Sequence, residues 1–331
     1  MLVAKTPLRI SFFGGGSDLP AFMNKEVGAS LSATINLYNY VTINETQRPI
    51  RFIHEDIQYG LANMRNHIVK ETLQQFHLKS GLDIVSMSDV HATGAGLGGS
   101  SAFTVGLLNA LYAINDDMFF CINPETLAKK ACEIEIDFCN YPIGIQDQYA
   151  VAYGGMNLFK FYGNPRYAHK VETKIKPEII KALESRLVLI YSGVSRNGNS
   201  GTILQRQQSS MKDDKTKFDT MRLIRDRAYQ GVELLEAGDL IKFGQLLHAN
   251  WMDKKSLTGD LSNPEFDAMY DFAMKEGAVG GKLLGAGGGG FFLFYVPRMS
   301  SSFIPQMTKQ FPNSRYYPFQ FTEHGSTITK V

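Results

Sequence analysis

The feature that most constrains this chain is a run of glycines between a predicted strand and a predicted helix. Residues 94–102 read GAGLGGSSA, after the strand-like segment Leu82–Val90 and ahead of the apolar, helix-like segment Ser101–Asn115. Glycines let a backbone approach a ligand closely, and the first turn of a helix offers free N–H groups to a phosphate. A tight turn with a serine cap needs only one or two glycines, so the run predicts a phosphate-binding loop. Ser100 and Ser101 can cap the helix or ligate a phosphate-bound Mg²⁺.

The same run contains a weak dinucleotide-binding signature. Gly94, Gly96 and Gly99 satisfy the pattern G-x-G-x-x-G. A dinucleotide fold requires this turn to open a βαβ unit that alternating parallel strands continue. Here the predicted helix is followed by another, which begins at Asn123-Pro124 and runs to about residue 138. A nicotinamide oxidoreductase is therefore disfavoured.

The rest of the chain mixes strands and helices without regular βαβ alternation, which predicts an α+β fold. Strand patterns occur at Leu8–Phe12 and Leu31–Ile43. Lys176-Pro177 indicates a break between secondary-structure elements. The apolar strand Leu187–Tyr191 after it is typical of the start of a second sheet. We therefore predict two domains, 1–180 and 181–331. Helices are expected at about 214–237, 239–253 and 264–276, with a strand at 290–296.

Composition excludes several classes of protein. Thirty-four Lys and Arg residues against 32 Asp and Glu residues leave a net charge of +2, and no basic run indicates a nucleic-acid or anionic membrane partner. The apolar stretch Phe291–Val296 is far shorter than the ~20 residues of a membrane span. The first residues, MLVAKTPLR, lack a signal-peptide pattern. Cys121, Cys132 and Cys139 have neither disulfide-framework nor zinc-site spacing and are expected to be ordinary buried or partly buried thiols. The sequence predicts a soluble, cytoplasmic protein.

Three further segments suggest a site. Residues 281–290, GKLLGAGGGG, lead into a hydrophobic strand, which favours a loop pressed against a ligand over a flexible linker. Glu135 and Asp147 lie twelve positions apart, and Asp147 belongs to the segment GIQDQ, residues 144–148, between helical stretches. The N-terminal segment 7–18, PLRISFFGGGSD, places three glycines and an acid after a strand, where an ordinary hairpin turn is unexpected.

In this order and spacing, the segments from residue 7 to residue 290 resemble the three motifs of the GHMP kinase superfamily. The motif sequences PLRISFFGGGSDLP and GGKLLGAGGGGFF are most similar to those of the D-glycero-D-manno-heptose 7-phosphate kinases, and the similarity extends over the whole length of the chain. Galactokinases carry Gly-Glu-His-Thr-Asp where this chain has Gly14-Gly15-Gly16-Ser17-Asp18. The missing Glu counts against galactose as the substrate.

The resemblance implies a fold and a role for each matching residue. The fold is a ribosomal-protein-S5-like N-terminal domain that binds ATP and a ferredoxin-like C-terminal domain. Asp147 matches the catalytic base, and Arg9 a basic residue beside it. Ser101 and Glu135 match the Mg²⁺ ligands. The ATP phosphates are held by Gly94, Ala95, Gly96, Leu97, Gly98, Gly99, Ser100 and Ser101. The substrate side comprises Gly15, Gly16, Ser17, Asp18, Gly287 and Gly288, with Arg196 as first choice for a substrate phosphate.

The implied reaction is an ATP- and Mg²⁺-dependent phosphorylation of the anomeric C1 hydroxyl of D-glycero-D-manno-heptose 7-phosphate, for nucleotide-activated heptose and surface polysaccharide synthesis. The partners are then small molecules, and a homodimer is possible. Arg206, Lys254, Lys255 and Lys282 are further candidates for the substrate phosphate, and Tyr38, Phe52 and Tyr59 for the adenine. Two alternatives stay open: a kinase for a free sugar such as fucose or galactose, and a non-catalytic sugar and ATP sensor.

Overall fold

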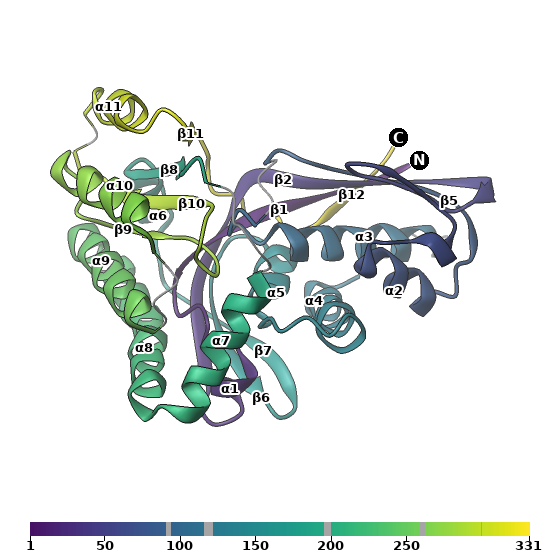
Figure 1. Cartoon of the computed structure of the whole chain (residues 1–331), viewed down its shortest axis with the longest axis horizontal. Helices are drawn as coiled ribbons and strands as arrows, with labels where there is room; N and C mark the ends of the chain where they lie inside the picture. The colour runs from purple at the N-terminus through teal and green to yellow at the C-terminus, as the bar shows by residue number, and fades with distance from the viewer. Residues whose placement is uncertain (91–93, 116–121, 195–199, 258–261, 299) are drawn as a thin grey trace.

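The computed structural model describes residues 1–90, 94–115, 122–194, 200–257, 262–298 and 300–331, and these form two sheets with helices packed against them (Figure 1). The first sheet has the strand order β12-β1-β2-β5-β3-β4, with β6 pairing to β2 and β7 to β6. Its strands are β1 (Leu2–Phe13), β2 (Gly28–Pro49), β3 (Arg51–Ile53), β4 (Ile57–Tyr59), β5 (Ser80–Ser88), β6 (Met156–Gly163), β7 (Arg166–Val171) and β12 (Thr327–Lys330). The helices of this half are α1 (Pro20–Met23), η1 (Leu61–Asn63), α2 (His67–Gln75), α3 (Gly99–Asn115), α4 (Pro124–Cys132), η2 (Glu133–Phe138) and α5 (Gln146–Tyr153). Helix α6 (Pro177–Glu184) lies with the second half (Figure 1).

The second sheet has the order β11-β8-β10-β9, and every neighbouring pair in it is antiparallel. Its strands are β8 (Leu187–Tyr191), β9 (Gly280–Leu283), β10 (Phe291–Tyr295) and β11 (Arg315–Tyr317). The helices of this half are α7 (Ser200–Asp213), α8 (Lys215–Ala237), α9 (Leu240–Leu257), α10 (Pro264–Lys275) and α11 (Phe303–Gln310). The predicted α+β class is confirmed, and helix α7 is an element that the sequence analysis did not predict.

Local sequence explains the helix boundaries that position the site. The Asn123 side chain accepts a hydrogen bond from the Thr126 N–H, and Pro124 occupies the first position of α4, as predicted. The helix then continues without a break as η2, a π-helical segment. Because a π-helix inserts an extra residue into the turn, it rotates the side chains beyond it, and such segments are frequent at functional sites.

Helix α3 is the central helix of the first half. It packs against β1 and β2 and contacts α4 and α5. Val105, Leu107, Leu108 and Leu111 in its interior are buried. A helix that is apolar around most of its circumference must lie inside the protein, so the glycine loop that precedes it is anchored at one end.

The end of the chain returns to the first half of the molecule. Strands β1 and β12 pair antiparallel, and the two ends of the chain lie together (Figure 1). The sheets change between β7 and β8, on either side of residue 180, but the last strand returns to the first sheet. A division at residue 180 therefore separates the two sheets except for β12.

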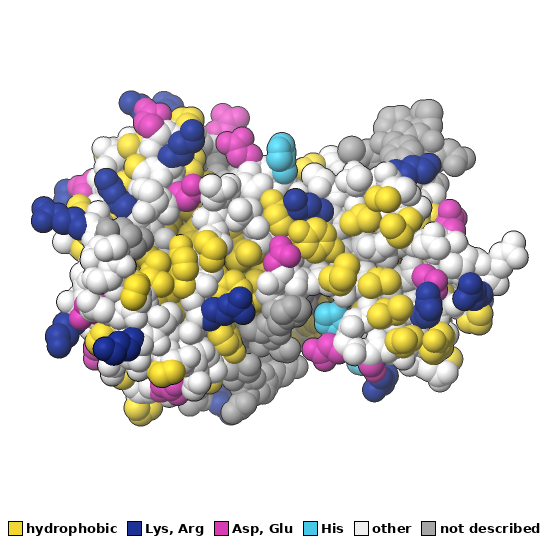
Figure 2. All heavy atoms as spheres, turned by 90° about the horizontal axis from the view of Figure 1, so that it is seen from above, with side chains coloured by type: hydrophobic (Ala, Val, Ile, Leu, Met, Phe, Trp, Pro, Cys, Tyr) yellow, Lys and Arg dark blue, Asp and Glu magenta, His cyan; other side chains and the backbone are white. Residues whose placement is uncertain are grey.

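The surface is mixed in character. Figure 2 shows Lys and Arg side chains scattered among Asp and Glu side chains on one face. Cys132 is buried and Cys139 is half-buried, while Cys121 lies outside the described residues. Within the described ranges no helix combines the length and the apolar character that crossing a membrane requires.

Candidate active site

A cavity of about 1210 Å³ lies at the junction of the two halves. That volume exceeds the roughly 300–1,000 Å³ of a typical single-ligand pocket, so it has room for two substrates. Strand β1, the loop before α3, helix α5, helix α7 and the segment after β9 all contribute to its wall. The cavity therefore gathers segments that are up to about 280 residues apart in the chain.

The two glycine-rich segments meet directly at this cavity. Gly96 has a φ of +81°, and a Cβ atom there would lie 2.4 Å from the carbonyl oxygen of Leu284. The Phe291 N–H donates to the Ala95 carbonyl oxygen at 3.3 Å. All eight residues from Gly94 to Ser101 line the cavity, as do Gly285 and Ala286 from the second segment. Both glycine-rich segments therefore contribute to the wall of one cavity.

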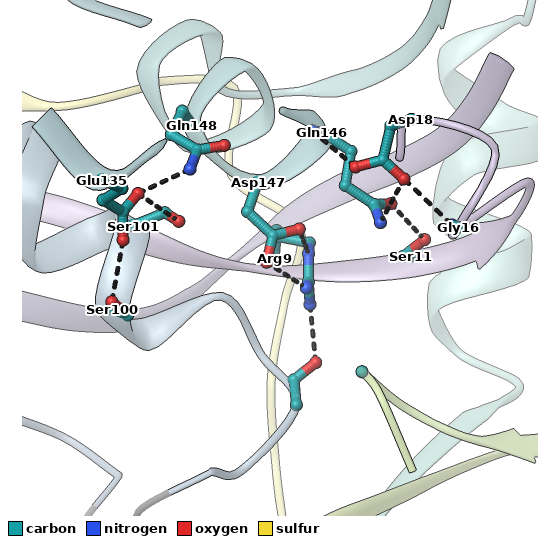
Figure 3. Close-up of polar contacts among 12 residues, drawn as sticks. Arg9, Ser11, Gly16, Asp18, Ser100, Ser101, Glu135, Gln146, Asp147 and Gln148 are labelled. Atoms are coloured by element: carbon teal, nitrogen blue, oxygen red, sulfur yellow. Dashed lines mark hydrogen bonds and ion pairs between the residues drawn. The ribbon is translucent and has the colours of Figure 1, made fainter. Parts of the chain in front are cut away.

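Arg9 and Asp147 form a two-pronged ion pair inside the cavity (Figure 3). Arg9 Nε donates to Asp147 Oδ1 at 2.8 Å and Nη2 donates to Oδ2 at 2.7 Å. Its third nitrogen, Nη1, donates to the Gly96 carbonyl oxygen at 2.6 Å. Asp147 lies in the first turn of α5, where a helix favours negative charge. The arginine thus fixes the orientation of the carboxylate and ties it to the glycine loop.

Glu135 is buried in η2, next to the start of α3 (Figure 3). Its Oε1 accepts from Ser100 Oγ at 2.8 Å, and its Oε2 accepts from Ser101 Oγ at 2.9 Å and from Gln148 Nε2 at 2.5 Å. Burial raises the pKa of Glu135 to about 7, outweighing the hydrogen bonds that lower it. No cationic side chain is recorded as pairing with this carboxylate in the described segments.

These groups suit a divalent cation. A carboxylate and two hydroxyls are oxygen donors, which Mg²⁺ prefers, and a buried carboxylate without a cationic partner favours a positive ion nearby. Across the described residues, no three His, Cys, Asp or Glu side chains gather into a metal site. Mg²⁺ commonly takes only one or two carboxylates and completes its shell with phosphate oxygens and water. The donor set therefore fits Mg²⁺ bound together with a nucleotide.

Asp18 lies on the far side of the ion pair from Glu135 (Figure 3). Its carboxylate accepts from the N–H groups of Gly16 at 2.9 Å and Gln146 at 3.1 Å, and from Gln146 Nε2 at 3.2 Å. Burial raises the pKa of Asp18, and the nearby Asp147 carboxylate adds to the rise. A Cβ at Gly144 would lie only 1.8 Å from Asp18 Oδ2, so a glycine there makes room for this carboxylate.

Only some of the other predicted substrate residues line the cavity. Gly15 and Gly16 line the cavity, whereas Ser17 does not. The Ser17 hydroxyl lies 2.7 and 2.9 Å from the carbonyl oxygens of Gly14 and Ala29, so it holds the turn together. Gly287 and Gly288 lie just beyond the lining residue Ala286 and are not part of the cavity wall. Arg196 lies outside the described residues.

Several residues of the cavity wall were not predicted from the sequence, and others were named only as candidates. Phe52 lines the cavity, as do Asn39 and His54, but Tyr38 and Tyr59 do not. Gln207 of α7 also lines it and lies against Gly16. Among the cationic candidates, Lys254 and Lys282 line the cavity, whereas Arg206 and Lys255 do not. Only the three-dimensional fold could identify these residues, because each is a common residue type in an ordinary sequence context.

Comparison with known proteins identifies the family of this chain. The profile for the GHMP kinases N terminal domain matches residues 63–155, which include the glycine loop, Glu135 and Asp147. The profile for the GHMP kinases C terminal region matches residues 232–306, which include the second glycine segment. The D-glycero-alpha-D-manno-heptose 7-phosphate kinase of Campylobacter jejuni is 31% identical to this chain, covering 97% of it and 96% of its own length.

Two further comparisons agree. The galactokinase of Pyrococcus furiosus is 25% identical over 90% of this chain and 89% of its own length. The crystal structure of a D-glycero-D-manno-heptose 1-phosphate kinase from Bacteroides thetaiotaomicron matches with a TM-score of 0.79 and 26% identity, covering 100% of this chain and 99% of that one. The chain therefore belongs to the GHMP kinases and is an ATP-dependent kinase of that family.

Proposed function

We propose that this kinase transfers the γ-phosphoryl group of ATP to the anomeric C1 hydroxyl of D-glycero-D-manno-heptose 7-phosphate. The similarity to the Campylobacter heptose 7-phosphate kinase supports the sugar, and it extends over nearly the whole chain. The observation that carries the chemistry is the Asp147 carboxylate, held by Arg9 in the same cavity as the glycine loop and Asp18. An oriented carboxylate between a phosphate-binding loop and a polar pocket is the arrangement that a sugar kinase needs.

In the proposed reaction, the C1 hydroxyl gives its proton to Asp147 as its oxygen bonds to the γ-phosphorus. The bond from that phosphorus to the β–γ bridging oxygen breaks, and ADP leaves. Each oxygen of Asp147 accepts one hydrogen bond from Arg9 and keeps a lone pair for the substrate hydroxyl. An anomeric hydroxyl is more acidic than an ordinary alcohol, so a carboxylate is a sufficient base. The N–H groups at the start of α3 hold the β and γ oxygens.

Ser101 and Glu135 would hold Mg²⁺, which neutralises phosphate charge when bound. The serine hydroxyl and the carboxylate already lie together at 2.9 Å beside the glycine loop. Ser100 keeps the other carboxylate oxygen in place from the same turn of α3. Two oxygens from this chain leave the remaining coordination positions to phosphate oxygens and water.

The base of ATP would lie at the end of the cavity formed by Asn39, Phe52 and His54. Phe52 is buried and offers an apolar surface, with the His54 ring stacked on it at 6.4 Å between centroids. The Asn39 Oδ1 atom is buried and has no hydrogen-bond partner among the described residues. An amino group of the base is a suitable donor for it.

The 7-phosphate requires cationic side chains beyond the sugar ring. Arg196 remains our first choice from the sequence, and Lys254 and Lys282 are described cations that line the cavity from the second half. Lys254 Nζ also donates to the Gly285 carbonyl oxygen. Truncating Arg196 to Ala is expected to raise the KM for heptose 7-phosphate about ten- to a hundredfold and to leave the KM for ATP unchanged, because a charge-assisted phosphate contact is worth about 1.5–3 kcal/mol.

The deciding experiment offers the purified protein ATP with heptose 7-phosphate, heptose 1-phosphate, free heptose, fucose and galactose. ADP release gives kcat/KM for each sugar, and phosphorus NMR of the product locates the new phosphate. We expect the highest kcat/KM with heptose 7-phosphate and a new phosphate at C1. Equal turnover of heptose and its 7-phosphate would instead indicate a free-sugar kinase. Preference for heptose 1-phosphate would agree with the name of the Bacteroides structure, and absence of turnover with any sugar would favour a sensor.

We further propose that residues 1–180, joined by β12, bind ATP, and that residues 181–331 close the acceptor side. A homodimer and a role in nucleotide-activated heptose and surface polysaccharide synthesis remain predictions from the resemblance, and a cytoplasmic location remains a prediction from the composition. Size-exclusion chromatography with light scattering would test the first of these directly.

A further inference from the structure

Helix α7 contributes one polar side chain to the acceptor end of the cavity. Gly201, Leu204 and Gln207 line the cavity at a spacing of three residues, which places them on one face of the helix. The helix packs against α1 and α8 (Figure 1), and its Met211 belongs to a small apolar core with Leu19, Phe22 and Met221. This packing holds the lining face of α7 against the glycine turn that carries Asp18.

Gln207 is unusual in that position. Its side chain is only 3% exposed, and its Nε2 atom is buried with no hydrogen-bond partner among the described residues. Buried amide nitrogens almost always have an acceptor, so an unpaired one indicates that the acceptor is a molecule not present in the structure. The backbone of Gln207 is ordinary: its carbonyl accepts from Ser210 Oγ within the helix.

The surroundings of this amide indicate what it binds. A Cβ built at Gly16 would lie 2.5 Å from Gln207 Nε2, so the amide lies directly against the glycine turn. On the same residue, the Gly16 N–H donates to Asp18 Oδ1 at 2.9 Å. The two side chains thus flank Gly16, one as a donor and the other as an acceptor. A hydroxyl group can satisfy both, because it donates one hydrogen bond and accepts two.

We propose that Gln207 is a specificity-determining residue that donates a hydrogen bond to a ring hydroxyl of the acceptor sugar. This inference rests on the proposed sugar kinase function but not on which sugar is phosphorylated. The amide supplies a neutral donor from the second half of the molecule, opposite the carboxylates of the first half. It therefore selects sugars that carry a hydroxyl in the matching position.

The test compares Gln207→Met with Gln205→Met. Methionine keeps the length of the side chain and removes the amide. Gln205 also lies on α7, is exposed and is not part of the cavity wall. Both variants are assayed with the sugar that the native enzyme phosphorylates most efficiently. If that sugar is not heptose 7-phosphate, the native enzyme already shows that the proposed substrate is wrong, and the comparison of the variants still tests Gln207. If no sugar is phosphorylated, the proposal falls with the kinase function.

We expect Gln207→Met to raise the KM for that sugar about three- to tenfold, the usual size for one neutral hydrogen bond, and to change the KM for ATP less than twofold. Gln205→Met should leave both unchanged. A series of monodeoxy sugars gives the decisive readout: for one of them, native enzyme and Gln207→Met should show the same KM. An unchanged sugar KM, equal rises for sugar and ATP, or a penalty that persists with every deoxy sugar would overturn the proposal.

Discussion

Lys282 on β9 donates a hydrogen bond to the carbonyl oxygen of Phe12 on β1 at 2.8 Å, and a second to that of Ser11 at 2.9 Å. The register of β1 against β2 shifts between Ser11 and Phe13, leaving Phe12 without a partner residue in that ladder. A buried lysine amino group from the second sheet thus binds backbone carbonyls at an irregularity of the first. This contact fixes the second glycine segment relative to the strand that carries Arg9.

Lys282→Met should therefore destabilise the protein. The variant leaves two carbonyls without their donor, partly offset because a buried charge is also removed. We expect the free energy of unfolding to fall by about 1–3 kcal/mol, measured by urea denaturation. Lys255→Met is the matched control: Lys255 pairs with Asp267 at 3.1 Å near the surface, and its loss should cost less than about 1 kcal/mol. Equal stability of Lys282→Met and native protein would contradict the role of this contact.

The same variant has a pH signature. Burial, with the positive charges of Lys254 and Arg9, lowers the pKa of Lys282 well below its ordinary 10.5. At pH values between the lowered pKa and 10.5, Lys282 is protonated in the unfolded chain but not in the folded chain. Its contribution to the free energy of unfolding therefore increases as the pH rises through this range. Lys282→Met lacks that contribution. The stability difference between native protein and variant should grow from pH 7 towards pH 10, and a constant difference would count against the shift.

Asp147→Asn should retain the fold and ATP binding but lose about 10²–10⁴ of kcat, because the near-isosteric amide cannot accept the hydroxyl proton. Activity is measured by ADP release and ATP affinity by calorimetry. Asp137→Asn is the control, since Asp137 pairs with Arg166 outside the cavity and should change neither quantity. Native kcat in Asp147→Asn would remove this carboxylate from the mechanism.

Glu135→Gln should raise the Mg²⁺ concentration that gives half-maximal activity, and Ser101→Ala should raise it less. A carboxylate is a stronger ligand for Mg²⁺ than a neutral hydroxyl. The measurement is a Mg²⁺ titration at saturating ATP, with circular dichroism to check folding because Glu135 accepts three side-chain hydrogen bonds. If both titrations match the native one, the metal is bound by other groups.

Gly144→Ala should act on the acceptor through Asp18. The added methyl carbon would lie 1.8 Å from Asp18 Oδ2 and 2.4 Å from its Cγ, so the carboxylate must move. We expect the sugar KM to rise about tenfold or more, the effect of losing a charged hydrogen bond, with little change for ATP. Asp18→Asn should show the same pattern in the same assay. A rise in the KM for ATP alone would show that Gly144 acts elsewhere.

Much of this architecture could be predicted from local patterns. The helix starting at Asn123-Pro124, the buried helix after the glycine loop and the opening strand of the second sheet are where the sequence indicates. Each depends on capping, glycine content or hydrophobic periodicity within a few residues. Helix α7 has polar residues on most of its surface, so its pattern was too weak to predict. The return of β12 to β1 spans more than 300 residues, which no local signal specifies.

The sequence by itself determined which segments carry chemistry, because phosphate loops, caps and strand endings depend on residues that are close together in the chain. Only the tertiary structure decided which side chains meet. Arg9 finds Asp147 across 138 positions, and Lys282 finds Phe12 across 270. The amide of Gln207 acquires its place beside Gly16 only when α7 packs on α1. Such pairings arise from the burial of apolar faces between distant elements, and so the polar contacts of the site follow from the packing of the core.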